Sequence, residues 1–500
     1  MTNILKSEKF ANIIGILKTV YFAIFTVYLI TREITALNYF IDSLFVTGFF
    51  VGMAALFIGY DLLTNRYCLK TRYLPAALLF LTITVISCII NYNYGIFSNM
   101  KGLAAFVIYL FLIYPDAFKG KSNTTLNVIS YTACLTLCIY TLASIPMYFY
   151  NVYYYTQDHR WQGFLPLHDR LWGLYQEPGY ASLYALITIC LSVLLFSKTK
   201  SIILKILLVF CDLVQIIFIS LGGSRMATLA AIIALIWASF VFVFKKLKVK
   251  VIYKALILLL CITVSIFAPL SIISTVNSGL PLIKRAILKN GTPQTYVAVH
   301  EIYDKFYTAG KVPINVGYAD EIKIEEYPFE DTSQTVDRSD NPAEISNGRF
   351  ARWLDGIKVL IKSPIFGTSP RNIVSFAKDF ASNTLMGKSE YSIHNTYLEI
   401  LTGVGIFGGI AILAFLVLAA IYVIKIALDI SSNIKITVCS IIVLIIAFSA
   451  ILLPDIIFFQ TTFAGFLFWL SLGHCLNTNI NSYKNSLSQK LIRKLFKKES

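Results

Sequence analysis

A small set of basic side chains in this sequence could do chemistry on a phosphorylated substrate. Guanidinium groups bind phosphate oxygens in a bidentate manner and stay charged. A histidine with an ordinary pKa of about 6.5 can accept a proton from a hydroxyl group. Together such groups could stabilise a departing phosphate and deprotonate an attacking hydroxyl. The candidates are Arg170, Arg225, Arg349, Arg352 and His394.

His394 opens the stretch HNTYLEILTGVGIFGG, in which a polar start runs directly into an apolar, glycine-spaced helix. One role for this histidine is to accept or position a hydroxyl proton, and the alternative is a helix-start histidine satisfied by backbone groups or lipid headgroups. Glu399 could orient the helix or the imidazole, or be an ordinary interfacial glutamate. We assign the glycines of this stretch to close helix packing, namely Gly403, Gly405, Gly408 and Gly409.

The arginines also have alternative interpretations. Arg225 begins an apolar stretch and follows two glycines, where backbone can approach a ligand closely. Because charge at membrane depth is costly, a functional role is the default for Arg225, and the alternative is a side chain that reaches out to lipid phosphates. Arg352 is either a helper of Arg349 or a surface residue. Arg170 is either a substrate ligand or an ordinary interfacial arginine.

These residues belong to a chain with the composition of a membrane protein. Hydrophobic residues make up 57% of the 500 residues, charged residues make up 14%, and the mean hydropathy is +0.70, values atypical of soluble globular proteins. The prediction is an all-α polytopic membrane protein. The predicted helices, about twelve spans of roughly 20 residues each, are 11–30, 43–62, 73–91, 102–117, 124–148, 179–196, 202–221, 225–244, 252–273, 396–424, 435–453 and 456–475.

Positive charge orients the predicted bundle with both termini in the cytoplasm. In this orientation the short outer loops hold few Lys and Arg residues, as the positive-inside rule requires, whereas the inner side carries runs such as KKLKVK (Lys245–Lys250). The net charge of +16 therefore reflects inner loops that face anionic lipids, and no nucleic-acid partner is expected. All nine cysteines lie in predicted spans or on the inner side, which argues against a disulfide-stapled outer domain.

The chain divides into four predicted parts. They are the first nine spans (residues 1–275), a long, partly helical outer loop between spans 9 and 10 (276–395), the last three spans (396–478) and a basic cytoplasmic tail (479–500). The outer loop is the one predicted part that could build a domain outside the membrane.

The long outer loop changes character along its length. Residues 276–310 have a helical, amphipathic pattern, whereas 311–347 are acidic and polar and predict a surface excursion with little core. From Asn347 apolar residues return at helical spacing, and Pro364 and Gly367 close this helix. The outer segments hold no credible Asp-x-Asp or histidine cluster, since the motif DRSD has the wrong spacing and lies in the polar excursion. We therefore expect neither a metal nor a cofactor.

Four of these segments together resemble the bacterial O-antigen polymerase and O-antigen ligase superfamily. GRFARWLDGIKVLIKSPIFGTSPRN resembles the family's outer-loop signature, and HNTYLEILTGVGIFGG resembles the pattern with which the family enters the span after that loop. GGSRMATLAA is similar to the family's Gly-Ser-Arg turn, and DRLWGLYQEPGYAS is more weakly similar to an element that leads into an earlier span. The order, spacing and predicted side of the segments all agree with the family.

The resemblance implies a glycosyltransferase at the periplasmic face of the bacterial inner membrane, with an undecaprenyl-pyrophosphate-linked oligosaccharide as its substrate. It implies that Arg225 and Arg349 bind the pyrophosphate and that His394 accepts the proton of the acceptor hydroxyl. Further substrate contacts are assigned to Arg352, Arg170 and Glu399. The partners to expect are the lipid-linked donor and acceptor, membrane lipids, a chain-length regulator and a repeat-unit flippase.

Three activities fit this interpretation. The favoured one is polymerisation of repeat units into O-antigen by metal-independent, inverting transfer. The second is an O-antigen ligase that transfers the glycan to lipid A core by the same chemistry, although the length of the chain and the acidic stretch of its loop favour the polymerase. The third is a flippase or transporter of the lipid-linked oligosaccharide. A transporter would show internal repeats and broken or charged helices near the midplane, whereas the polar residues here gather on one side.

Overall fold

Helices dominate the computed structural model of the chain. The structure describes residues 7–41, 43–118, 122–150, 152–155, 161–165, 170–247, 249–288, 348–389, 391–428 and 434–476. Within these ranges the prediction of an all-α polytopic membrane protein is confirmed. The predicted acidic excursion 311–347 and the basic tail 479–500 lie outside the described residues.

Nine helical segments among the described residues are long and apolar enough to cross a membrane. They lie in α2 (Glu8–Thr31), α4 (Leu44–Leu63), the segment Ile96–Ala117, α7 (Ser122–Phe149), α8 (Pro178–Phe196), α9 (Ile202–Gly222), α10 (Arg225–Lys246), α11 (Val251–Leu288) and α16 (Thr396–Leu428). Three shorter apolar helices are α5 (Leu74–Ile90), α17 (Ile434–Ser449) and α18 (Phe463–Leu476). Each predicted span therefore has an apolar helix at its position, and α11 continues past its predicted end at residue 273.

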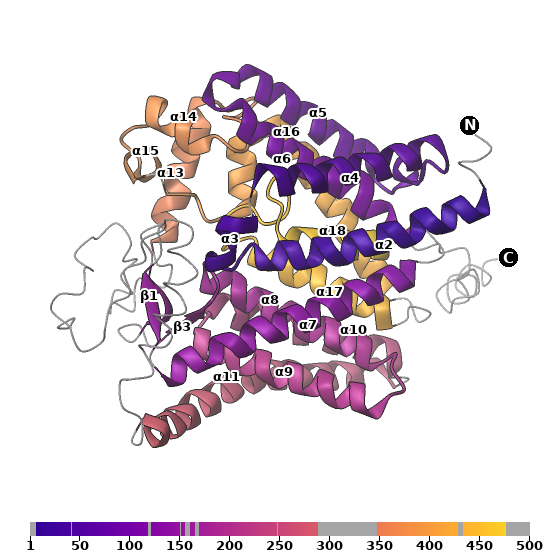
Figure 1. Cartoon of the computed structure of the whole chain (residues 1–500), viewed down its shortest axis with the longest axis vertical. Helices are drawn as coiled ribbons and strands as arrows, with labels where there is room; N and C mark the ends of the chain where they lie inside the picture. The colour runs from indigo at the N-terminus through magenta and orange to yellow at the C-terminus, as the bar shows by residue number, and fades with distance from the viewer. Residues whose placement is uncertain are drawn as a thin grey trace.

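The shorter elements gather at one end of the helix bundle, at the left of Figure 1. They are α3 (Thr35–Ile41), α13 (Arg349–Lys362), α14 (Ile373–Phe380), α15 (Leu385–Ser389) and a small sheet. The described start of α2 lies at the opposite end of the bundle. That the candidate residues share one side of the membrane stays a prediction.

A small antiparallel sheet lies between α7 and α8. Its strands, in the order β1–β2–β3, are β1 (Tyr153–Tyr155), β2 (Trp161–Leu165) and β3 (Arg170–Gly173). The sheet was not predicted, because an aromatic-rich segment favours extended backbone but in a membrane protein is equally typical of an interfacial belt. It is an addition to the helical class and places Arg170 at the start of its last strand.

The segment Ile96–Ala117 is helical but irregular. Its parts are α6 (Ile96–Ile108), the π-helical turn η3 (Tyr109–Ile113) and the 3-10 turn η4 (Tyr114–Phe118), while the 3-10 turns η1 (Tyr67–Lys70) and η2 (Tyr92–Tyr94) flank α5. Lys18 Nζ donates to the Leu112 carbonyl oxygen at 3.1 Å and pairs with Asp116 Oδ1 at 2.9 Å. The irregular turns thus supply partners for a lysine that α2 buries among apolar helices.

α16 is broken at Gly405, whose φ of 70° is left-handed. The backbone of residues 363–370, which follows α13, fills the break. Two hydrogen bonds join the segments, from the Ile406 N–H to the Pro364 carbonyl (2.8 Å) and from the Thr368 N–H to the Thr402 carbonyl (3.0 Å). Gly405 therefore does more than the helix packing we assigned to it, because it lets a second chain segment enter the helix.

Residues 450–462 form a loop between α17 and α18, where the sequence predicted an almost continuous pair of spans. The predicted spans 435–453 and 456–475 are correct in position but too long as helices. The difference has a local cause, since Pro454 lacks an N–H and disfavours helix in the residue before it, and the Asp455 carboxylate caps the backbone that follows. The loop is nonetheless apolar and mostly buried.

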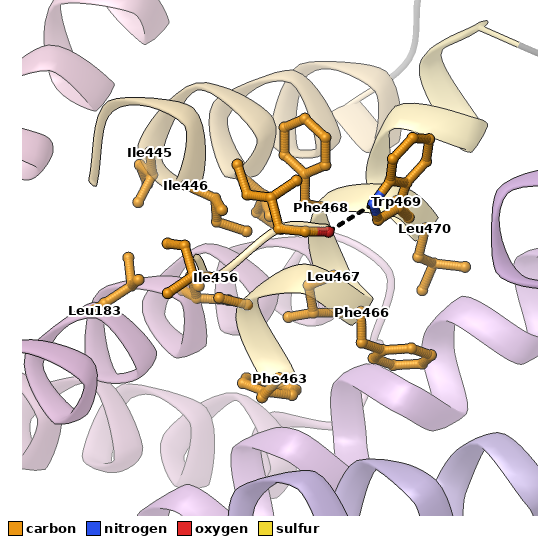
Figure 2. Close-up of a cluster of buried hydrophobic side chains, with 14 of the residues drawn as sticks. Leu183, Ile445, Ile446, Ile456, Phe463, Phe466, Leu467, Phe468, Trp469 and Leu470 are labelled. Atoms are coloured by element: carbon orange, nitrogen blue, oxygen red, sulfur yellow. Dashed lines mark hydrogen bonds between the residues drawn. The ribbon is translucent and has the colours of Figure 1, made fainter. Parts of the chain in front are cut away.

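Trp469 of α18 holds this loop within a buried cluster of hydrophobic side chains. Its indole N–H donates to the Ile457 carbonyl at 2.8 Å, the contact drawn as a dashed line in Figure 2. Its ring lies 5.7 Å from that of Phe106 and 5.6 Å from that of Phe415, measured between centroids. Aromatic packing of this kind adds to the stabilisation by burial, so the loop is fixed inside the bundle from several helices at once.

Replacing Gly405 by alanine should destabilise the protein by roughly 2–3 kcal/mol, because alanine is strained in the left-handed region and its Cβ would collide with the Ile365 carbonyl. The matched control is Gly48→Ala on α4, where a Cβ meets nothing within 4 Å and helix propensity predicts a small gain. Thermal unfolding of the purified protein in detergent measures the stability of both variants. Equal melting temperatures would contradict the proposed importance of the break.

Candidate functional site

Arg225 is the first residue of α10 and lies directly after a tight turn from α9. The turn passes through Gly223, whose φ is 55°, and Ser224 caps α10 by accepting a hydrogen bond from the Ala227 N–H at 3.4 Å. The Arg225 side chain is exposed at this end of the bundle. The cap and the turn therefore fix the backbone from which a charged side chain projects.

Arg170 supports this turn from the neighbouring sheet. Its Nε donates to the carbonyl oxygen of Gly222 at 2.9 Å, and its side chain is half-buried. The predicted role of Arg170 as a substrate ligand stays a prediction. What the structure adds is a positioning role, because the hydrogen bond holds the last residue of α9 beside β3.

Arg349 and Arg352 occupy the first turn of α13, and both are half-buried. Burial lowers the pKa of Arg349, the Glu177 carboxylate opposes this effect, and the cations of Arg352 and Arg225 add to it. Burial also lowers the pKa of Arg352, against the opposing effects of Tyr391 and Glu177. Because an arginine starts from a very high pKa, both side chains stay charged at neutral pH.

Arg349 therefore lies within electrostatic reach of Arg225, Arg352 and Glu177, and Arg352 lies within reach of Glu177. Three cations and one carboxylate leave an excess of positive charge, which an anionic ligand would neutralise. Glu177 was not predicted as a site residue. The available signal was its place in the segment DRLWGLYQEPGYAS, directly before the Pro178 that opens α8.

His394 lies on the short segment between α15 and α16. The Cζ atom of Arg352 lies 4.7 Å from the centroid of the Tyr391 ring. Gly356 of α13 lies so close to Ile393 that a Cβ at this glycine would collide with it. The residues just before His394 are therefore packed against α13. His394 itself is half-buried, with a left-handed φ of 53°. A non-glycine residue in this region costs about 1–3 kcal/mol and often marks a functional site.

The helix that follows is capped by another residue. α16 begins at Thr396, and the side chain of Asn395 accepts a hydrogen bond from the Leu398 N–H at 3.1 Å. Capping therefore does not require the His394 side chain. Whether His394 accepts a proton or is a helix-start residue stays open.

Glu399 connects α16 to the buried loop 450–462. Its Oε2 accepts a hydrogen bond from the Asp455 N–H at 2.8 Å, and the backbone of His394 also interacts with the Glu399 carboxylate. The Asp455 carboxylate in turn accepts hydrogen bonds from three backbone groups, the N–H of Ile457 (3.1 Å), Phe458 (2.9 Å) and Phe459 (2.6 Å). Glu399 is thus buried and holds a loop, which is a different setting from the interfacial position considered in the sequence.

Glu33 is a second acidic residue that the sequence did not single out. The Tyr184 hydroxyl donates to its Oε1 at 3.3 Å, and the Gln176 N–H donates to its carbonyl oxygen at 2.9 Å. Burial raises the pKa of Glu33 to about 7, with Arg32 opposing and Glu177 adding to the shift. The backbone pairing between the ends of α2 and α8 therefore brings two carboxyl groups close together.

Arg371 lies in one of the segments that resemble the superfamily, but it was not predicted as a site residue. Its side chain is exposed and lies within electrostatic reach of both Glu399 and Asp455. Its backbone N–H donates to Asn99 Oδ1 at 3.3 Å, and the Asn99 amide donates to Ser369 Oγ at 3.0 Å. The segment after α13 is thus anchored in α6, a long-range contact that no local pattern reveals.

Within the described ranges no group of three or more His, Cys, Asp or Glu side chains is arranged to hold a metal ion. Independence from metals stays a prediction. The chemistry that the site offers is that of guanidinium groups, carboxyl groups and one imidazole.

Comparison with protein families finds a match over part of this chain. Residues 210–413 match the family model described as O-antigen ligase. The match runs from α9 into α16, so it spans Arg225, Arg349 and His394 together with the elements that position them. A comparison with curated proteins finds no match.

The family match confirms the resemblance stated from the sequence and supports the superfamily of O-antigen ligases and polymerases for this chain. It implies an enzyme of glycosyltransferase-like or ligase activity in lipopolysaccharide biosynthesis. Together with the many apolar helices, it describes a multi-pass membrane enzyme.

The Asp455→Ala variant should unfold at a clearly lower temperature, because three buried N–H groups would lose their acceptor, at a cost of roughly 3 kcal/mol or more. Asp455→Asn keeps one carbonyl oxygen as an acceptor, so its unfolding temperature should fall less than that of Asp455→Ala. Asp379→Ala, which removes an exposed carboxylate on α14, serves as the control. A melting temperature for Asp455→Ala no lower than that of the control would refute the capping role.

Glu33→Gln should flatten the dependence of stability on pH. The folded protein keeps the Glu33 carboxyl protonated up to a pKa of about 7, whereas the unfolded chain releases this proton near the ordinary value of 4.5. The stabilisation is complete below the lower value and is lost as the pH rises through the higher one. Because glutamine cannot ionise, the variant should lose less stability than the wild type between about pH 5 and about pH 8.

Melting temperatures across this pH range measure the effect, with Asp379→Asn as a control that should follow the wild type. A Glu33→Gln curve parallel to that of the wild type would show that Glu33 does not titrate in this range.

Proposed function

We propose that this protein polymerises undecaprenyl-pyrophosphate-linked oligosaccharide repeat units into O-antigen at the periplasmic face of the inner membrane. The observation that carries the proposal is that Arg349 lies near Arg225 and Arg352, although α10 and α13 are far apart in the chain, and that the segment leading to His394 packs against α13. The family match over these residues supports the joining of glycans as the reaction.

The leaving group of this reaction is a lipid-linked pyrophosphate, which carries several negative charges. Arg225 and Arg349 would bind its oxygens, and Arg352 would add charge from the next position on α13. An anion would relieve the mutual repulsion of these arginines, so binding and leaving-group stabilisation rest on the same groups. Glu177 would keep the arginines oriented toward the substrate.

The acceptor hydroxyl needs a group that takes its proton. In the proposed step, the hydroxyl oxygen forms a bond to C1 of the donor sugar while the bond from C1 to the pyrophosphate oxygen breaks. The proton passes to the His394 imidazole, and the electron pair leaves with the pyrophosphate. A single displacement inverts the configuration at C1, so a retained configuration in the product would exclude this step.

An O-antigen ligase is the alternative, and the name of the matching family favours it. A ligase would use the same arginines and histidine but accept a hydroxyl of lipid A core. The acidic stretch of the outer loop, absent from a compact ligase-like loop, is the reason for preferring the polymerase.

The test is the ladder of surface polysaccharide on a gel, from a deletion strain complemented with the wild type or a variant. We expect His394→Ala, Arg225→Ala and Arg349→Ala to lower long-chain glycan about 100-fold or more, the usual cost of losing one group that stabilises the transition state. The amount of long-chain glycan in Arg225→Lys should lie between those of the wild type and Arg225→Ala, because an ammonium keeps the charge but not the bidentate geometry.

Lys378→Ala, at an exposed position on α14, is the control for loss of positive charge on the same face, and immunoblots of membranes check the amount of each variant. A deletion strain that retains core with one repeat unit identifies a polymerase. Bare core with accumulated lipid-linked polymer identifies a ligase instead. Normal ladders from the three alanine variants would overturn the mechanism.

A further inference from the structure

α13 carries an apolar face that no described part of the chain covers. Four of its side chains are exposed, Phe350 by 62%, Leu354 by 59%, Ile357 by 43% and Ile361 by 67%. Their spacing of four, three and four residues places them on one narrow side of the helix. Such a stripe is unusual on a helix that lies in water, where large exposed apolar patches mark an interaction surface.

The opposite face of α13 is fixed to the protein, so the apolar face cannot turn inward. Asp355 Oδ2 accepts a hydrogen bond from the N–H of Leu385 in α15 at 2.7 Å, and the Thr402 hydroxyl of α16 donates to the Gly356 carbonyl at 3.4 Å. Val359 is fully buried on the same side. The exposed stripe is therefore a permanent feature of the fold.

The two edges of the apolar face have the composition of an interfacial helix. Lys358 and Lys362 lie along one edge, and both are exposed, while Lys358 Nζ pairs with Asp355 Oδ1 at 2.9 Å. Trp353 lies along the other edge, half-buried, with its indole N–H unpartnered among the described residues. Lysine at the border of an apolar face can reach lipid phosphates, and tryptophan favours the headgroup level.

The stripe is continuous with the exposed apolar surface of α16, a helix long and apolar enough to cross a membrane. Phe366, just after α13, lies 6.1 Å from Phe407 of α16 between ring centroids, and the neighbouring Ile406 and Ile410 of this spanning helix are 47% and 60% exposed. Figure 1 shows α13 running across the ends of the long helices rather than along them. A helix in this orientation lies along a bilayer surface when the long helices cross the bilayer.

We propose that α13 is an in-plane membrane anchor whose apolar face is covered by the acyl chains of phospholipids in the leaflet nearest the candidate site. This interaction is separate from binding of a glycan substrate. It sets the depth of the α13 N-terminus, so that Arg349 and Arg352 lie at the level of phosphate groups. A lipid-linked anion would then meet the arginines without leaving its own leaflet.

The test places the photoreactive residue benzoylphenylalanine at Leu354 or Ile361 of the full-length protein in nanodiscs of phosphatidylethanolamine and phosphatidylglycerol without any polyprenyl lipid. After irradiation, intact mass spectrometry detects covalent phospholipid adducts. Ile410 on α16 is the positive reference, and the exposed Ser375 on α14 is the control. We expect adducts at both α13 positions at about the level of Ile410 and at least about tenfold above Ser375, as for side chains buried in the acyl boundary.

A second measurement needs no change to the apolar face. Brominated phospholipids should quench the part of the fluorescence that is lost in Trp353→Phe, because this indole lies at the edge of the face. Three results would overturn the proposal. If Leu354 and Ile361 give no adduct while Ile410 reacts, the face is covered by water. If they crosslink two copies of the chain, the face forms a dimer, and if adducts form only after polyprenyl phosphate is added, it is a carrier-binding surface.

Discussion

The need to satisfy every backbone N–H and C=O group away from water governs this structure more than any other constraint. A regular helix meets it alone, but two stretches near the candidate site are not helical and still lie inside the bundle. Residues 450–462 depend on the Asp455 carboxylate and the Trp469 indole, and residues 363–370 depend on the broken backbone of α16. Irregular backbone at this depth is possible only where the protein itself supplies such partners.

The same two stretches tie the candidate residues to the bundle. Glu399 bonds to the backbone of the first stretch, and the second leads from α13 to Arg371. Charged groups that would be mobile on a surface loop are therefore held by buried contacts on several helices. Preorganised charge of this kind stabilises a transition state without reorganisation during the reaction, and it explains why a site at the end of a bundle needs an elaborate support.

Hydropathy predicted the helical class and the position of each span, because crossing a bilayer demands runs of apolar residues that any sequence reveals. It could not show that residues 450–462 leave the helix, since their side chains are as apolar as those of a span and only Pro454 and Asp455 signal the change. The arginines and His394 were predicted from their types and local motifs. Glu33 and Glu177 were missed, because their importance comes from pairing between distant segments and not from any local pattern.

The contact between Gly405 and the segment after α13 also bears on how such proteins diverge. The contact fixes the two segments against each other but places no limit on the length or sequence of the chain that precedes α13. Insertions and deletions there would leave the proposed reacting groups in place, even where they change what the surface recognises. Relatives that differ in acceptor should therefore vary most between α11 and α13, and should keep a residue without a side chain at the position of Gly405.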